Sequence, residues 1–155
     1  MDVLFICFNM KVSEIKVYYT NKNQEKIKIE NSHQLYDLAI SIWNMKTIEL
    51  QEEVKVLYLN RNNLVLGYYS LAKGGISACC VDIRLILSTA LKANASAIVV
   101  IHNHHPSSNP NPSKSDWNLT EKIQNACKLL DLVFVDHLVL TKETYFSFAD
   151  KEFFL

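Results

Sequence analysis

The feature that most constrains this chain is an apolar run that ends in a cluster of histidines. Residues 97–101 (AIVVI) are uninterrupted apolar and mostly β-branched, a pattern typical of a buried strand. His102, His104 and His105 follow directly, and a loop rich in proline and asparagine leads to Ser113. The sequence therefore predicts a buried strand that delivers several titratable side chains to one end of a sheet.

The spacing of these polar residues is compatible with a metal site. Alternate residues of a strand point to the same side, so His102 and His104 can converge on one ion. Asp116 follows twelve residues after His104, where a helix is expected to begin. Two imidazoles and one carboxylate leave one tetrahedral position on zinc open to water, as in hydrolytic sites. The spacing is equally compatible with a polar strand end and with Ser113 and Asp116 serving as a helix capping box.

The periodicity of the remaining residues predicts an α/β fold. Alternation predicts a hairpin over residues 15–30, and Asn31–Ser32 is a helix cap before an apolar stripe that ends at Trp43. Further strands are expected at 54–59, 64–69, 97–101, 133–140 and 145–148, and further helices at 81–92 and about 116–130. We therefore expect an α/β sandwich in which helices flank a mixed β-sheet.

Length and composition favour a single soluble domain over residues 1–155. The chain has 16 Lys plus Arg and 16 Asp plus Glu, so it lacks the basic excess that most nucleic-acid binders use to neutralise phosphates. Its four cysteines include no C-x-x-C pair, which predicts free thiols in a reducing compartment. The start of the chain lacks the basic segment and long apolar run of a signal peptide or membrane span. We expect a cytoplasmic protein in which residues 1–9, before Met10, are an N-terminal extension.

The segment from His102 to Asp116 reads H-N-H-H-P-S-S-N-P-N-P-S-x-x-D and resembles the JAMM motif H-x-H-x7-S-x-x-D in the form found in the bacterial RadC family. Other segments occur in that family's order: Q-E-E-V-K-V-L-Y-L-N-R, G-G-I-S, V-D-x-R, D-H-L-V-L and Y-F-S-F-A-D. The resemblance covers roughly residues 48–150. It implies a JAB/MPN domain with a cytidine-deaminase-like fold and the activity of a zinc metallopeptidase, which hydrolyses an amide or isopeptide bond in a peptide or protein substrate.

The resemblance also implies a role for individual residues. His102, His104 and Asp116 correspond to the zinc ligands, and Ser113 to the residue that supports the reacting water or the oxyanion. The family's distant glutamate, a general base and then an acid, falls on Glu52. The alternation of side chains along a strand also favours Glu52. Glu52 lies on the same side as Val54, which is expected to face inwards, whereas Glu53 lies on the opposite side with Lys55.

The chain departs from the family pattern at two places. One extra residue lies between the second histidine and Ser113, so either His104 or His105 is the second ligand; a loop accommodates an insertion at less cost than a strand end, which favours His104. Ser108 stands where the family has a glycine. Asp136–His137 matches a family pair that either orients the site or forms a buried structural contact.

Two other functions are compatible with the resemblance. A JAB fold can serve as a non-catalytic interaction module, and the RadC name is associated with DNA repair. The neutral charge balance gives the repair role little physical support.

Overall fold

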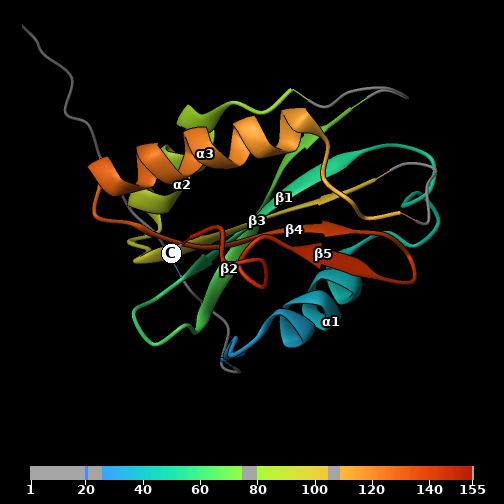
Figure 1. The fold of residues 1–155 in the computed structure, drawn as a ribbon. Helices are drawn as coiled ribbons and strands as arrows, with labels where there is room; N and C mark the ends of the chain where they lie inside the picture. The colour runs from blue at the N-terminus through green and yellow to red at the C-terminus, as the bar shows by residue number, and fades with distance from the viewer. Residues whose placement is uncertain (1–19, 21–25, 75–79, 105–108, 155) are drawn as a thin grey trace, which may run out of the picture.

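A computed structural model describes residues 20, 26–74, 80–104 and 109–154 (Figure 1). A five-stranded sheet in the order β2-β1-β3-β4-β5 forms its centre. The strands are β1 (Glu53–Leu59), β2 (Val65–Lys73), β3 (Ala97–Asn103), β4 (Val133–Leu140) and β5 (Tyr145–Ser147). The helices are α1 (Ser32–Ile42), α2 (Ile83–Lys92) and α3 (Lys114–Leu129). Only β3 and β4 pair in parallel, so the sheet is mixed, and the predicted α/β class is confirmed.

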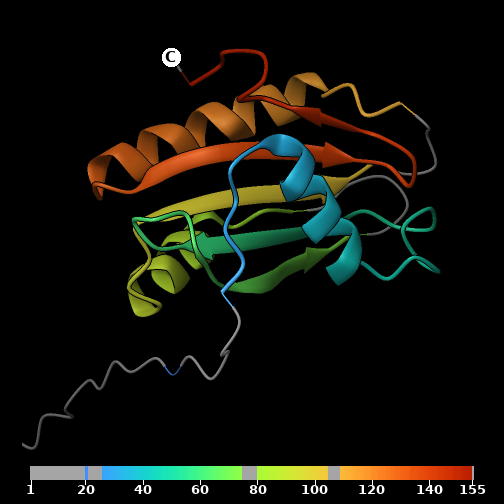
Figure 2. The ribbon, with the colours of Figure 1, turned by 90° about the horizontal axis from the view of Figure 1, so that it is seen from below.

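The helices cover both faces of the sheet. Figures 1 and 2 show α2 and α3 on one face and α1 on the other. Alternate residues of β1 follow this division: Val56 and Tyr58 pack in the cluster with α2 and α3, and Leu57 and Leu59 pack in the cluster with α1. Every residue of β1 and β3 is buried for this reason, which explains why residues 97–101 are apolar without alternation.

The predicted hairpin over residues 15–30 is wrong for its described part. Residues 26–30 form a single bridge, Lys28 with Leu64, instead of a regular strand. The segment bonds to the chain around the start of β2: Val65 N donates to Ile27 O at 2.8 Å, and Ile29 N donates to Asn63 O at 3.0 Å. Of its two apolar residues, Ile29 is buried against the α1 side of the sheet, whereas Ile27 is exposed, so the alternation does not mark a regular strand. Residues 15–19 and the predicted turn at 21–23 lie outside the described residues.

The other predicted elements are present: β4 has the predicted bounds, and the remaining elements differ at one or both ends. The Asn31 side chain caps α1 by accepting a hydrogen bond from Gln34 N at 2.9 Å, as predicted. The return strand β2 continues to Lys73, four residues beyond the expected end at Tyr69. Within the described ranges, no helix has both the length and the apolar character needed to cross a bilayer. Residues 1–9, and with them Cys7, lie outside the described ranges.

A buried ion pair lies on the α1 face of β1. The Nζ atom of Lys55 is 3.1 Å from Oε2 of Glu53 and 4.7 Å from the centre of the Trp43 ring, and the two charged residues are only 6% and 2% exposed. Burial alone would raise the pKa of Glu53, but the hydrogen bond and charge of Lys55, together with Lys73, lower it below its usual value. Glu53 is therefore a buried structural acid.

We predict that Glu53→Gln lowers the free energy of unfolding by roughly 3 kcal/mol, because it leaves the Lys55 ammonium buried without its partner. The pKa of Glu53 is lowered on folding, so this contribution is present at neutral pH and disappears as the pH falls through the lowered value. Urea unfolding at pH 7 measures the effect. The double variant Glu53→Gln/Lys55→Met should recover most of the loss. Glu49→Gln, which removes an exposed ion pair with Lys142, should change stability by less than about 1 kcal/mol. An unchanged stability in Glu53→Gln would contradict this account of the pair.

Candidate metal centre

Three side chains converge where the carboxyl end of β3 meets the first turn of α3. His102 and His104 extend from the end of β3, and Asp116 is the third residue of α3. Nε2 of His102 lies 3.3 Å from Oδ1 of Asp116, and Nε2 of His104 lies 3.3 Å from Oδ2. One ligand atom from each residue lies within 4.8 Å of the others. The fold therefore brings together the three predicted ligands in a group that could hold a metal ion.

The electrostatics of the cluster favour a carboxylate facing two imidazoles. Burial alone would raise the pKa of Asp116, but the hydrogen bond with His104 and the nearby His102 and Ser113 lower it far below its usual value. Burial lowers the pKa of His102 to about 4, so this ring is neutral at pH 7. The hydrogen bond to Asp116 raises the pKa of His104, against the opposing effect of burial.

The Nε2 atom of His102 has no hydrogen-bond partner among the described residues, although it is buried. The nearby Oδ1 of Asp116, at 3.3 Å, does not meet it with hydrogen-bond geometry. A buried polar atom that is left unpaired costs free energy, and two facing atoms that both carry lone pairs repel each other. A bound cation between these two atoms would remove both costs.

Ser113 contacts Asp116 directly as the N-cap of α3. Its hydroxyl donates to Oδ2 of Asp116 at 2.7 Å and accepts from Asp116 N at 3.2 Å, while Ser113 N donates to the same Oδ2 at 2.7 Å. The predicted capping box is present. These bonds occupy Oδ2 and fix the carboxylate, which leaves Oδ1 directed towards His102.

Glu52 lies immediately before β1 and is half-buried. In the antiparallel register Val54 pairs with His102, so continuing the same register one step beyond the strands places Glu52 opposite His104. Residues opposite each other in a sheet share a face, and this parity puts Glu52 on the face that carries the cluster. The Glu52 charge is also among the smaller contributions that raise the pKa of His104.

Asn103 holds the segment that precedes Glu53. Its side chain is fully buried, accepts from Glu53 N at 2.7 Å, and donates to Ile48 O at 2.6 Å and to Gln51 O at 2.9 Å. Three main-chain groups on both sides of Glu52 are therefore fixed by one amide. Sequence reasoning missed this residue, although an asparagine between two histidines on a buried strand is a signal that could have identified it.

The Asp136–His137 pair divides between the two sides of β4. The ring of His137 reaches His102, with 2.8 Å between Nε2 of His137 and Nδ1 of His102, and its other nitrogen lies 2.6 Å from Oγ1 of Thr120. Asp136 instead accepts from Ser147 Oγ and Ala149 N. Asp136 therefore forms a buried structural contact, and His137 contacts the histidine cluster. Thr120, four residues after Asp116 on α3, was not predicted from the sequence.

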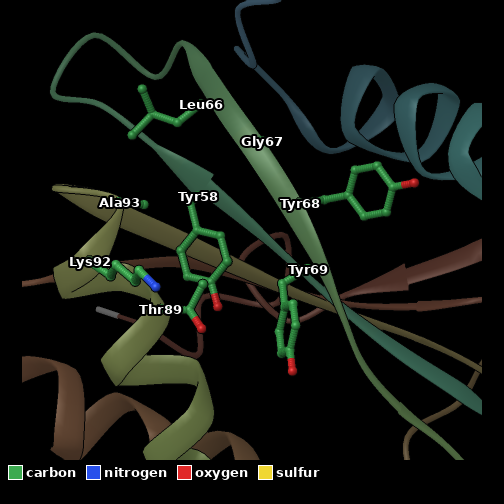
Figure 3. A pocket seen from close by; sticks show the side chains of 8 residues that line it. All are labelled: Tyr58, Leu66, Gly67, Tyr68, Tyr69, Thr89, Lys92 and Ala93. Atoms are coloured by element: carbon green, nitrogen blue, oxygen red, sulfur yellow. The ribbon is translucent and has the colours of Figure 1, made fainter. Parts of the chain in front are cut away.

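A separate hollow lies between β2 and α2 (Figure 3). Its lining includes Tyr58, Tyr69, Thr89 and Lys92, and it contains none of the residues of the histidine cluster. Most of its surface is apolar, in contrast to the cluster of imidazoles and carboxylates at the end of β3. Among the described residues, the cluster of possible metal ligands therefore lies at the end of β3, apart from this hollow.

Comparison with known proteins agrees with the fold and the motif. Residues 29–153 match the family model described as RadC-like JAB domain. The chain is 42% identical over 103 residues to a UPF0758 protein of Flavobacterium johnsoniae, which covers 66% of this chain and 44% of that protein. It is 40% identical to a UPF0758 protein of Actinobacillus pleuropneumoniae and 33% identical to one of Aquifex aeolicus, over 80% and 83% of this chain. The chain spans about half the length of these relatives, 56% and 53% of the latter two.

We predict that Asn103→Asp destabilises the protein by roughly 3 kcal/mol at pH 7, because a carboxylate would face the carbonyl oxygens of Ile48 and Gln51 in place of a donor. Hydrogen exchange should show lost protection of the main chain around residues 48–53. Urea unfolding measures the stability, and Asn118→Asp, an exposed change of the same charge on α3, is the matched control. If both variants are equally stable, Asn103 does not clamp this segment.

Proposed function

Because the chain belongs to the family of RadC-like JAB domains, we propose that it is a zinc-dependent hydrolase of amide or isopeptide bonds. The single observation that carries the proposal is the contact between Nε2 of His102 and Oδ1 of Asp116. These atoms lie 3.3 Å apart without a hydrogen bond between them. Bond lengths of about 2.0–2.2 Å place neighbouring ligand atoms of tetrahedral zinc about 3.3–3.5 Å apart, so the pair fits this ion.

The donor set also favours zinc over other biological cations. Two imidazole nitrogens and one carboxylate oxygen suit zinc, whereas calcium and magnesium prefer sets made of oxygen atoms alone. His102, His104 and Asp116 would hold the ion. Zinc in a site with three protein ligands supplies a water molecule of lowered pKa and polarises a substrate carbonyl.

In this proposal the carboxylate of Glu52 transfers a proton from the attacking water to the leaving amine. It would accept a proton on one of its oxygens as the water attacks and return it to the nitrogen of the leaving amine. The position of Glu52 opposite His104 and the hydrogen bond from Gly74 N to its carbonyl oxygen, at 2.8 Å, support this assignment. Asn103 would keep the carboxylate in place by fixing residues 48, 51 and 53.

Ser113 would contribute in two ways. Its hydroxyl and main-chain N–H hold Asp116 through Oδ2 at 2.7 Å each, which keeps the carboxylate oriented towards the two histidines. Support of a developing oxyanion, the role implied by the family, requires the hydroxyl to rotate away from Asp116. We propose that the substrate is a peptide or protein; the balance of 16 basic and 16 acidic residues does not favour nucleic acid.

We predict that the purified protein binds about one zinc ion per chain, and that His104→Ala abolishes this binding because a site of three protein ligands loses one. His105→Ala should retain the metal. His105 lies outside the described residues, and it is the matched control because it is the adjacent residue of the same type. Elemental analysis after dialysis, with competition by a chromophoric chelator, measures both. The reverse result would make His105 the second ligand.

We predict that Glu52→Gln keeps the fold and the zinc content but lowers hydrolysis by about 10²–10⁴-fold, the usual contribution of a positioned general base. Quenched-fluorescence libraries of peptides and of isopeptide-linked lysine conjugates supply the substrates. Glu30→Gln, an exposed change of the same kind before α1, should leave the rate unchanged. Full activity in Glu52→Gln, or no hydrolysis of either library by the zinc-loaded protein, would contradict the hydrolase proposal and favour a non-catalytic JAB module.

A further inference from the structure

A chain of hydrogen bonds links the main chain of α3 to the ring of His102. Oγ1 of Thr120 lies 2.6 Å from Asp116 O and 2.6 Å from Nδ1 of His137, and Nε2 of His137 lies 2.8 Å from Nδ1 of His102. The three side chains come from α3, β4 and β3, and all three are buried. The chain ends at the Nε2 atom of His102, which is the unpaired atom of the candidate metal centre.

The direction of these bonds follows from the number of protons available. A carbonyl oxygen can only accept, so the single hydroxyl proton of Thr120 is donated to Asp116 O. Oγ1 must therefore accept from His137, which places a proton on Nδ1 of that ring. A neutral imidazole has one N–H, so Nε2 of His137 accepts, and the proton between the two rings lies on Nδ1 of His102. Nε2 of His102 is left with its lone pair.

Two observations exclude the opposite direction. It would leave Thr120 Oγ1 and Asp116 O only 2.6 Å apart without a proton between them. It would also place a proton on the buried Nε2 of His102, which has no acceptor in hydrogen-bond geometry among the described residues, even though Oδ1 of Asp116 lies 3.3 Å away. A doubly protonated His137 is disfavoured because its ring has no exposed surface and its two bonded partners are neutral.

We propose that Thr120 and His137 are positioning residues that fix the Nδ1–H tautomer of His102, so that its Nε2 lone pair faces Asp116 and is available to a metal ion. Metal-binding histidines usually donate their second ring N–H to a carbonyl or carboxylate, which fixes the ring and its tautomer. Here the acceptor for Nδ1–H of His102 is the ring of His137. The hydrogen bond of His137 with Thr120 sets which nitrogen of His137 accepts. The consequence for metal affinity rests on the proposed zinc site; the tautomer itself does not.

The surrounding packing keeps this arrangement rigid. The ring of His137 stacks on Phe148, with centroids 5.0 Å apart and an angle of 10° between the planes, and Phe148 is fully buried. Thr120 lies one helical turn after Asp116, so the helix that supplies the carboxylate ligand also supplies the start of the hydrogen-bond chain. Any movement of α3 relative to the sheet would disturb the carboxylate and the tautomer together.

Thr120→Val tests the proposal, because valine has nearly the shape of threonine but cannot accept a hydrogen bond. The proton on Nδ1 of His137 should then move to Nε2 of that ring. Because Nε2 of His137 would now donate to Nδ1 of His102, the proton of His102 should move from its Nδ1 to its Nε2. Nitrogen-15 NMR of the imidazole rings in the metal-free, full 155-residue chain reads the tautomers directly. We expect Nδ1–H on His102 in the wild type and in Thr120→Ser, and Nε2–H in Thr120→Val.

Zinc affinity, measured by competition with a chelator, should fall about 10- to 100-fold in Thr120→Val and stay within about threefold of the wild type in Thr120→Ser. A second pair of variants serves if Thr120→Val does not fold. His137→Gln offers an amide oxygen that can accept from Nδ1 of His102 and should retain most of the affinity, whereas His137→Leu offers no acceptor and should lose it.

Nε2–H on His102 in the wild-type, metal-free protein would overturn the proposal, as would wild-type zinc affinity in both Thr120→Val and His137→Leu. Failure of the zinc site gives a different result. In that case His102 of the wild type would show Nδ1–H while no zinc binds.

Discussion

The structure of the candidate centre depends on one buried contact, between Nε2 of His102 and Oδ1 of Asp116 at 3.3 Å. In the proposed tautomer both atoms present lone pairs, so the pair would be unfavourable without a cation between them. The rest of the fold holds the two atoms in this position. The central strand β3 fixes His102, and the capping box at the start of α3 fixes Asp116 through its other oxygen. The strand and the capping box thus hold together three side chains that could bind a metal ion.

The layers of the fold explain why the polar groups of the centre remain on one face. Val54 pairs with His102, and the same parity places Glu52 with His104, on the side covered by α2 and α3. The residues of opposite parity, Glu53 and Asn103, are buried on or near the α1 side and have structural contacts. The side covered by α2 and α3 therefore carries the residues of the proposed metal site. The opposite side carries the contacts that stabilise the segment around Glu52.

The sequence predicted those features that depend on local spacing. The apolar run, the H-x-H pair and the Ser113–Asp116 cap follow from strand and helix periods. The structure places the apolar run in β3, and the two histidines and the cap at the carboxyl end of that strand. The expected side of Glu52 follows from the same strand period. Contacts between distant segments were missed because no period encodes them. Asn103 bonds to groups about 50 residues away. His137 of β4 bonds both to His102 of β3 and to Thr120 of α3. Glu53 is buried beside Lys55 and Lys73, which strand parity alone does not show.

The most direct test of the account is anomalous X-ray scattering at the zinc edge from crystals of the purified protein. The account predicts a single zinc peak bonded to Nε2 of His102, to His104 and to Asp116 at about 2.0–2.2 Å, with a fourth position open to water. A peak at another place, no peak in zinc-loaded crystals, or a fourth position filled by His105 would contradict it.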